Sequence, residues 1–188
     1  QLAGKVQVSH MLLGHHQNDQ AETVLLRLLR GAGPHGLAAM SPVSIRNHLY
    51  LVRPWLDVPR KKLEALADDY AGQTGWYPVA DPSNQQDQYT RSALRGRLVP
   101  ELDDRWPAWR GNVVRHARQS AEAREILQEV ALGDFETLAP SGDKTSFSLA
   151  RWRTLSPARQ THVLRYWLDF HGLPMPSEAR LHELIKQL

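Results

Sequence analysis

A short polar segment, GHHQND, directly follows an apolar run near the start of the chain and combines two histidines with a carboxylate. His15 and His16 have side chains that bind metals, orient phosphates or transfer protons near neutral pH. Asp19 is a candidate metal ligand or a charge partner for an amine. Each residue also has a purely structural interpretation, because Asp19 fits a helix N-cap and the histidines fit loop-end packing. The residue types alone leave both interpretations open.

The elements expected around this segment place it where ligands bind. Residues 10–14 are typical of a short buried strand, and residues 19–30 show the apolar spacing of a helix. Asp19 and Glu22 have the pattern of a capping box, which predicts that the helix begins there. Open α/β sheets bind ligands at the carboxyl ends of their strands. The histidines would therefore lie at the ligand edge.

Residues 31–36, GAGPHG, match the dinucleotide-binding pattern G-x-G-x-x-G. That motif requires a strand before the glycines and a helix after them, so that the helix N-terminus meets the pyrophosphate. Here a predicted helix precedes Gly31, and no strong helix start follows Gly36. The flanking residues favour a turn that ends a helix, with Gly31 at the C-cap position, over a dinucleotide site.

The pattern of elements changes near residue 87. Residues 48–56 predict a second strand, and Asp57 is expected to cap a helix that runs through Tyr70. The order β-α-β-α is typical of the later part of an α/β sheet domain. Beyond it we expect helices over 89–99, 107–130, 157–171 and 177–188, a loop over 139–146 and at most a minor strand near 146–149.

Composition limits the class of protein. The chain has 188 residues, enough for one domain or two small ones. Because it has no cysteine, disulfides and cysteine-ligated zinc are excluded. No apolar run has the length of a membrane span and no signal peptide is recognisable, which fits a cytoplasmic protein. The chain starts without Met and stops inside a helical pattern, so we expect a fragment of a longer protein.

Arginine supplies 18 of the 23 basic residues, and it is concentrated after residue 90. Residues 91–124 contain eight arginines and four acidic residues, a local net charge of +4 against +3 for the whole chain. The guanidinium group suits bidentate contacts with phosphates. A solvated helix face and a nucleic-acid-binding surface explain this pattern equally well.

Three segments taken in order resemble the tRNA(Ile)-lysidine synthetases: LLGHHQNDQAETVLLRLLRGAGPHGLAAM, LVRPWLDVPRKKL and DPSNQQDQYTRSALRGRLVPEL. The resemblance covers about residues 10–102. It depends on a His-His-x-Asp-Asp-Gln-x-Glu-Thr segment, an Arg-Gly-x-Gly-x-x-Gly-Leu turn, and an Asp-Pro-(Ser/Thr)-Asn segment followed by Tyr-x-Arg. The glycine pattern would then be a family turn.

The resemblance implies a fold class. The family consists of PP-loop ATP-pyrophosphatases, so we expect residues 1–102 to form the C-terminal part of a parallel-sheet PP-loop nucleotide-binding domain of the α/β class. Residues 103–188 are expected to form a mostly α-helical, tRNA-contacting domain that is truncated at its C-terminus.

The resemblance also implies a reaction. Enzymes of this family use ATP and Mg²⁺ to adenylate the C2 oxygen of the wobble cytidine in an isoleucine tRNA with a CAU anticodon. The ε-amine of free L-lysine then displaces AMP and leaves lysidine. The implied partners are isoleucine tRNA and free lysine, without a membrane; the oligomeric state stays open, a homodimer included.

Individual roles follow from the same resemblance. Asp19 would hold or orient the lysine amine, and Arg91 would stabilise charge on the cytidine or the adenylate phosphate. The residues expected to shape the nucleotide site and its neighbouring loop are His15, His16, Arg30, Gly31 and Gly33.

Other residues are expected to contact tRNA or to shape a turn. The candidates for contacts with tRNA phosphates are Arg95, Arg97, Arg115 and Arg118. Asp81 and Asn84 would fix the turn that delivers Arg91. Trp106 and Trp109 are candidates for base stacking, although core packing is the commoner use of tryptophan.

Two departures from the family pattern matter. The paired aspartates of the family are Asn18 and Asp19 here, which puts in question any step that needs both charges. The Ser-Gly-Gly-x-Asp-Ser loop that grips phosphate through backbone amides is absent from this chain. We therefore expect the fragment alone to be inactive, and the sequence identifies no magnesium ligands.

Two alternatives remain. Another PP-loop tRNA-modifying enzyme, such as a cytidine thiolase, would be expected to carry cysteine pairs for an iron–sulfur cluster, and this chain has none. A non-catalytic RNA-binding module on a degenerate PP-loop scaffold fits Asn18 and the absent phosphate loop.

Overall fold

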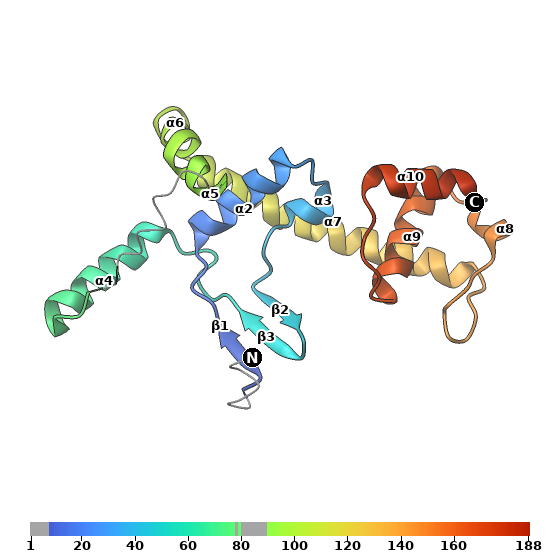
Figure 1. Ribbon diagram of the computed structural model, residues 1–188, viewed down its shortest axis with the longest axis horizontal. Coiled ribbons are helices and arrows are strands. Elements are labelled where there is room, and N and C mark those ends of the chain that lie inside the picture. The colour runs from blue at the N-terminus through green and yellow to red at the C-terminus, as the bar shows by residue number, and fades with distance from the viewer. Residues whose placement is uncertain (1–7, 78, 80–89) are drawn as a thin grey trace. The chain divides into compact units, whose positions relative to one another are not determined.

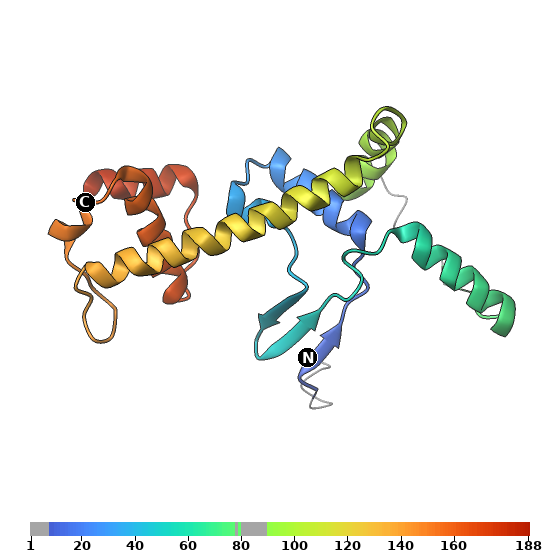
Figure 2. The same ribbon diagram turned by 180° about the vertical axis from the view of Figure 1, so that it is seen from behind.

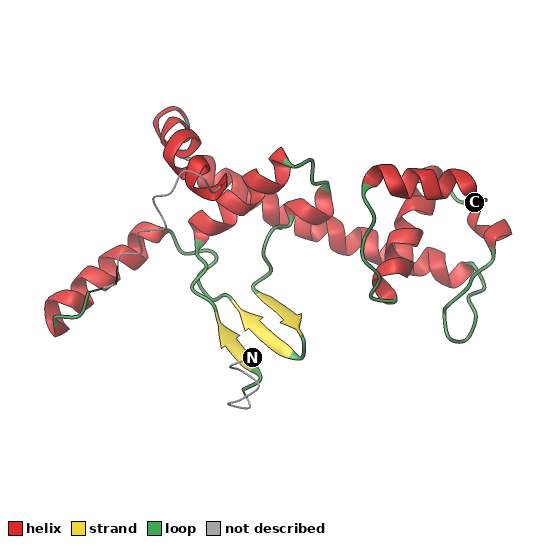
Figure 3. Cartoon of the chain, viewed as in Figure 1, coloured by secondary structure: helices red, strands yellow, loops and turns green. Residues whose placement is uncertain are grey.

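The computed structural model describes residues 8–77, 79 and 90–188 (Figure 1). The chain packs as two compact units, residues 1–121 and residues 122–188. Among the described residues helix predominates, and the strands belong to the first unit (Figure 3). This order confirms the expected class, an α/β part followed by a mostly helical part. The expected division between residues 102 and 103 remains a prediction.

A three-stranded sheet begins the first unit, with strand order β1-β3-β2. β1 (His10–Leu12) is parallel to β3 (Leu49–Val52), as the expected α/β order requires. The side chain of Leu12 is nevertheless 74% exposed, so the expectation of a buried strand over 10–14 was wrong. The reason is that the buried core of this unit forms around the first helix and not on the sheet.

The sheet is mixed, because β2 (Val43–Arg46) pairs antiparallel with β3. The sequence analysis missed β2 and its hairpin. Asn47 and His48 connect the two strands with φ values of 50° and 62°. Positive φ at both central residues is the geometry of a type I′ turn, which is usually recognised by a glycine that this turn lacks.

Helix α2 (Gln17–Leu29) starts two residues earlier than expected. Its N-cap is His16, whose Nδ1 accepts a hydrogen bond from the backbone N–H of Asp19 at 3.4 Å. The Asp19 carboxylate in turn accepts from the backbone N–H of His16 at 3.1 Å. The capping box is therefore His16–Asp19 and not the predicted Asp19–Glu22, because a neutral imidazole nitrogen can replace the usual hydroxyl acceptor.

The glycine-rich segment forms the turn after α2 that its flanking residues predicted. Gly31 has φ of 77°, a left-handed conformation that favours glycine. Gly33 then caps a one-turn helix, α3 (Pro34–Leu37). A Cβ atom at Gly36 would lie 2.6 Å from the Cβ of Ala32, so this glycine permits a close approach within the turn.

Helix α4 (Arg60–Thr74) follows β3 after an irregular segment. Its N-cap is Pro59, in an extended conformation, so the helix begins three residues after the predicted cap, Asp57. Gly72 lies inside the helix, and Gly75, with φ of 71°, ends it.

The helical segments that follow agree only in part with the helices expected over 89–99 and 107–130, because residues 99–105 are also helical and the last helix continues to Thr137. These segments are α5 (Thr90–Ala93), the π-helical segment η2 (Leu94–Leu98), α6 (Val99–Arg105) and α7 (Trp109–Thr137), which is one continuous helix (Figure 2). Ala21 of α2 packs with Trp109 and Val114 of α7 in a small buried cluster. Leu25, Val99 and Leu102 cover this cluster, which therefore joins α2 to the helices that carry the arginines.

The second unit packs the end of α7 with α8 (Leu149–Trp152), α9 (Pro157–Phe170) and α10 (Glu178–Gln187). Phe135, Trp152, Val163 and Leu181 are almost completely buried in its core. Residues 146–149, where at most a minor strand was expected, form no strand, because Ser148 caps α8 through the backbone N–H of Arg151.

Candidate active site on helix α2

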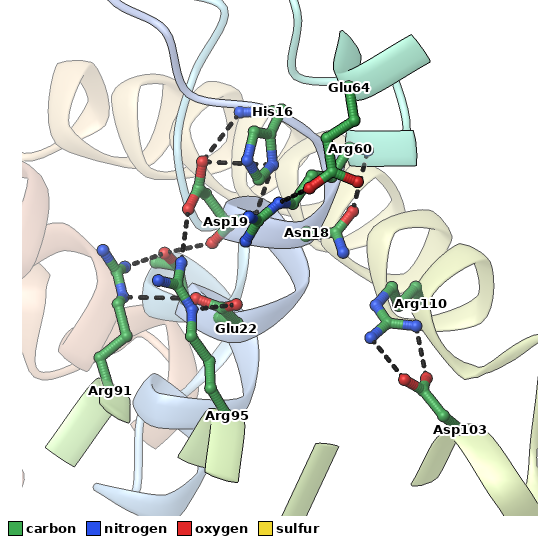
Figure 4. Close-up of polar contacts among 11 residues, drawn as sticks. His16, Asn18, Asp19, Glu22, Arg60, Glu64, Arg91, Arg95, Asp103 and Arg110 are labelled. Atoms are coloured by element: carbon green, nitrogen blue, oxygen red, sulfur yellow. Dashed lines mark hydrogen bonds and ion pairs between the residues drawn. The ribbon is translucent and has the colours of Figure 1, made fainter. Parts of the chain in front are cut away.

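Two carboxylates on α2 form the centre of the candidate site (Figure 4). Asp19 and Glu22 lie one helical turn apart, and only 9% and 5% of their surfaces are exposed. Arg95 contacts both: its Nη2 is 3.1 Å from Asp19 Oδ1, and its Nε is 2.7 Å from Glu22 Oε1. Since residues three apart share a helix face, the two carboxylates together bind one cation.

Arg91 reaches the same face of α2 from the turn before Arg95. Its Nη2 donates a hydrogen bond to Thr23 Oγ1 at 3.1 Å, and its Nε lies 3.6 Å from Glu22 Oε2. The side chain of Arg91 is 42% exposed, compared with 32% for Arg95. Arg91 is therefore anchored to the protein while part of its guanidinium group faces solvent.

The guanidinium group of Arg95 lies beside Glu22, and one oxygen of the Glu22 carboxylate has no hydrogen bond from the described residues. The hydrogen bond to Glu22 raises the pKa of Arg95 above its ordinary value, with support from the charges of Glu22 and Asp19 and against the effect of burial. Glu22 Oε2 is buried and has no hydrogen bond from the described part of the chain. A buried acceptor of this kind is suited to a donor on a ligand.

The two candidate histidines have different surroundings. The ring of His16 is used in the cap of α2. His15 is half-buried, and its Nδ1 is buried without a hydrogen-bond partner in the ranges that the structure describes. An unpaired buried nitrogen is a contact point for a ligand. His15 is therefore the more available of the two for the expected nucleotide site.

The turn residues of the candidate nucleotide site lie at the surface. Arg30, Gly31 and Gly33 are exposed. The turn is held instead by Arg27, which donates hydrogen bonds to the carbonyl oxygens of Gly36 at 2.7 Å and Ala39 at 2.9 Å. Sequence reasoning missed Arg27, whose position in the last turn of a helix resembles that of any surface arginine.

The arginines expected to bind tRNA do not form one group. Arg95 lies in the carboxylate site, whereas Arg97 is exposed. Arg115 and Arg118 lie one turn apart on an exposed face of α7. Arg115 donates to Asn112 at 2.9 Å, and Arg118 forms an exposed ion pair with Asp57.

The two tryptophans also differ. Trp109 is 5% exposed, and its Nε1 donates to Asp103 at 2.7 Å. Arg110 lies over its ring, 4.7 Å from the centroid, so Trp109 has the structural role that its residue type favours. Trp106 is 58% exposed. The stacking interpretation is therefore better suited to Trp106.

A pocket of 510 Å³ adjoins the start of α2. The residues that line it come from the starts of α2, α4 and α7 and from α6, and they include Asn18, Arg60, Glu64, Asp103 and Arg110. Arg60 and Glu64 form an ion pair of 2.7 Å, and Arg110 pairs with Asp103 (Figure 4). The pocket thus has a polar wall of mixed charge.

The part of the chain that the structure describes identifies no magnesium ligands. In the described ranges no three His, Asp or Glu side chains gather in a way that could hold a metal ion. Asp19 and Glu22 could supply oxygen ligands, but both already contact Arg95, and Glu22 also pairs with Arg91. Asp81 and Asn84, expected to shape the turn before Arg91, lie outside the described residues.

The complementary spacing of charges was a signal that sequence reasoning did not use. Asp19 and Glu22 are three residues apart on one helix, and Arg91 and Arg95 are four apart on another. Both spacings put the two side chains on one face. Glu22 was read only as a capping residue and Arg95 only as a tRNA contact, because nothing in the sequence places the two helices side by side.

Two family profiles match the chain. Residues 1–102 match a family described as a PP-loop domain, and residues 147–188 match one described as a TilS substrate binding domain. The first match covers more than half of the chain, so the chain belongs to the PP-loop family. In the ranges described, no helix is both long and apolar enough to cross a membrane.

Curated relatives narrow the comparison to one kind of PP-loop protein. The chain is 56% identical to the tRNA(Ile)-lysidine synthase of Bordetella parapertussis over 187 residues, which cover 100% of this chain and 54% of the relative. It is 44% identical to that of Ralstonia nicotianae, over 95% of this chain and 37% of the relative. The homology confirms the resemblance, and the chain spans about half the length of the Bordetella relative.

Among solved structures, the U34-tRNA thiolase NcsA from Methanococcus maripaludis matches with a TM-score of 0.47 and 14% identity. The match covers 64% of this chain and 39% of that one. A likeness at this level is too low to support a statement about function.

Proposed function

We propose that the protein to which this chain belongs ligates lysine to C2 of the wobble cytidine of an isoleucine tRNA with a CAU anticodon, through an adenylated tRNA intermediate. The observation that carries the proposal is the Asp19–Glu22 pair, two buried carboxylates that both contact Arg95, with Glu22 also paired with Arg91. The homology to tRNA(Ile)-lysidine synthases supports the choice of reaction.

The carboxylates suit an amine nucleophile. Arg95 offers them a positive charge and N–H donors, which are also the properties of a lysine ammonium group. Lysine must lose a proton before its nitrogen can attack, and a carboxylate within hydrogen-bond distance can orient the amine and accept that proton. Asp19 holds the amine in this proposal. Glu22 adds the buried oxygen Oε2, which lacks a hydrogen bond from the described residues.

Arg91 is placed to stabilise negative charge. Its Nε pairs with Glu22 and its Nη2 donates a hydrogen bond to Thr23. The exposed part of the guanidinium group can donate to an oxygen of the substrate. A fixed donor aimed at developing charge lowers the barrier of group transfer. The charge to be stabilised is on the cytidine ring and on the phosphate of the departing AMP.

The proposed ligands are ATP, free lysine, the tRNA and Mg²⁺. ATP supplies the adenylyl group that makes the C2 oxygen a good leaving group. His15 is the strongest contact candidate for the nucleotide because its buried Nδ1 is unpaired in the described ranges, and Arg30, Gly31 and Gly33 offer the adjacent exposed turn. The described residues contain no cluster of three metal-ligating side chains, so no ligand and no step is assigned to magnesium.

The surface of α7 is the proposed tRNA contact in the first unit. Arg115 and Arg118 are exposed and one turn apart, so both can approach phosphates on one RNA backbone. Arg97 is an additional exposed candidate. A tRNA substrate makes the cytoplasm the proposed location.

The test is incorporation of labelled lysine into isoleucine tRNA with the CAU anticodon, using the gene product that carries this chain, with ATP and magnesium. We expect lysine to be incorporated only when ATP is present, and a GAU-anticodon tRNA is the matched control. ATP-dependent incorporation of sulfur instead of lysine would contradict the proposal.

A non-catalytic RNA-binding module is the second candidate. It is favoured by the fact that Arg95 and His16 already contact the Asp19 carboxylate. Tight tRNA binding by the gene product, without incorporation of lysine under any condition, would support this candidate.

A further inference from the structure

Asn18 lies in the first turn of α2, but its side chain bonds outside that helix. Its Oδ1 accepts a hydrogen bond from the backbone N–H of Arg60 at 3.2 Å. Arg60 is the first residue of α4, and the N–H groups in the first turn of a helix have no acceptor within the helix. Pro59, the N-cap of α4, provides no side-chain hydrogen bond. Asn18 therefore caps α4 from a different helix.

Two further contacts join the start of α2 to residues 55–58, which precede α4; this junction is therefore held at three points. His16 and Trp55 form a parallel β-bridge, and the backbone N–H of Gln17 donates to the carbonyl oxygen of Val58 at 3.0 Å. Both are backbone contacts that most substitutions leave in place. The hydrogen bond of Asn18 is the side-chain contact in this series, so it can be removed without altering the other two.

The junction lies between the carboxylate site and the pocket. Asn18 precedes Asp19, and it lines the pocket together with Arg60 and Glu64, whose charged groups are 2.7 Å apart. Because Oδ1 is used by Arg60, the Nδ2 amino group remains as the donor of this side chain. The capping function needs an acceptor oxygen but no negative charge.

We propose that Asn18 is a positioning residue of the candidate active site. Its oxygen fixes the first turn of α4 against α2 and so sets the pocket wall of Arg60 and Glu64 relative to Asp19. A second carboxylate at this position is not required. The kinetic consequence rests on the proposed function, whereas the capping contact does not depend on it.

The first test measures amide hydrogen exchange of Arg60 by NMR in the 188-residue chain. Asn18→Ala is expected to accelerate exchange at Arg60 by about tenfold, the effect of one lost hydrogen bond, and Asn18→Asp should keep it slow. Gln73→Ala is the matched control, because it removes a side-chain hydrogen bond near the other end of α4. Unchanged exchange at Arg60 in Asn18→Ala would overturn the proposal.

The second test uses the gene product in the lysine-incorporation assay. Asn18→Ala should lower kcat by about tenfold or more with a smaller change in the KM for lysine, since misplaced groups reduce turnover more than binding. Asn18→Asp should restore kcat. Failure of Asn18→Asp to rescue both readouts would overturn the acceptor role. If the parent protein incorporates no lysine, the proposed function fails, and the exchange measurement still decides whether Asn18 caps α4.

Discussion

Arg95 bridges Asp19 and Glu22, with its Nη2 3.1 Å from one carboxylate and its Nε 2.7 Å from the other. The arginine comes from η2, more than seventy residues along the chain from the α2 carboxylates. Asp19 and Glu22, which the sequence presents as capping residues, and Arg95, which it presents as a surface arginine, thus form one charged cluster. The effect of replacing any one of these three residues therefore depends on the other two.

Replacing Arg95 with Gln should destabilise the protein, because it leaves two buried carboxylates without their shared cation. We expect the free energy of unfolding in urea to fall by about 2 kcal/mol, less than for a fully buried pair because Arg95 is partly exposed. Arg105→Gln, which breaks an exposed pair with Glu101, should change it by less than about 0.5 kcal/mol. Reduced tRNA affinity with unchanged stability would instead identify Arg95 as a phosphate contact.

Asp19→Asn removes the charge while it keeps the shape of the side chain. If Asp19 holds the lysine amine, the KM for lysine should rise or kcat should fall by about tenfold or more. The assay is lysine incorporation, normalised to the folded fraction by circular dichroism. Glu101→Gln is the control at an exposed acid. Normal activity per folded molecule would reduce Asp19 to a residue that caps α2 and pairs with Arg95.

Arg91→Gln should separate catalysis from tRNA binding. Arg91 contacts α2 through Thr23 and Glu22 and keeps an exposed portion, so its loss should lower turnover by about a hundredfold while tRNA affinity changes by less than about twofold. Single-turnover kinetics and filter binding measure the two quantities. A parallel fall in tRNA affinity would place Arg91 among the general RNA contacts.

The double substitution Arg115→Ala and Arg118→Ala should weaken binding of several tRNAs by a similar factor. Each lost phosphate contact should reduce the slope of log affinity against log salt by about one unit. A salt titration of tRNA binding by the 188-residue chain measures both effects, with Arg105→Ala as the control for an exposed arginine. Unchanged affinity and slope would show that this face of α7 is merely solvated.

We expect His162 to make the stability of the second unit depend on pH. Burial lowers the pKa of His162 below its ordinary value of 6.5, the charge of Arg165 adds to this, and Glu178 opposes it. The unfolded chain therefore takes up this proton at higher pH than the folded chain. Its contribution to stability is complete above about pH 6.5 and declines as pH falls through the range below.

His162→Gln should reduce this pH dependence, measured as the difference in unfolding free energy between pH 8 and pH 5. His182→Gln is the control, because the side chain of His182 is 60% exposed. If the parent and His162→Gln lose the same stability on acidification, burial of His162 does not contribute.

Local chemistry in the sequence determined most helices and their order. The helices expected over 157–171 and 177–188 correspond to α9 and α10, because the first-turn Pro157 and the serine cap Ser177 act within one helical turn. Gly31 ended α2 for a reason equally local, its left-handed backbone. The three segments between residues 10 and 102, taken together, likewise identified the family without any knowledge of contacts.

Tertiary structure decided which side chains meet. Pairing of β1 with β3, capping of α4 by Asn18 and the bridge from Arg95 to Asp19 and Glu22 each join segments whose approach depends on packing. Ala21 and Leu25 of α2 pack against Trp109 and Leu102, and this contact brings the arginine-bearing helices to the carboxylates. Periodicity in a sequence specifies the apolar face of each helix but not the partner that covers it, so these long-range contacts became visible only in the folded chain.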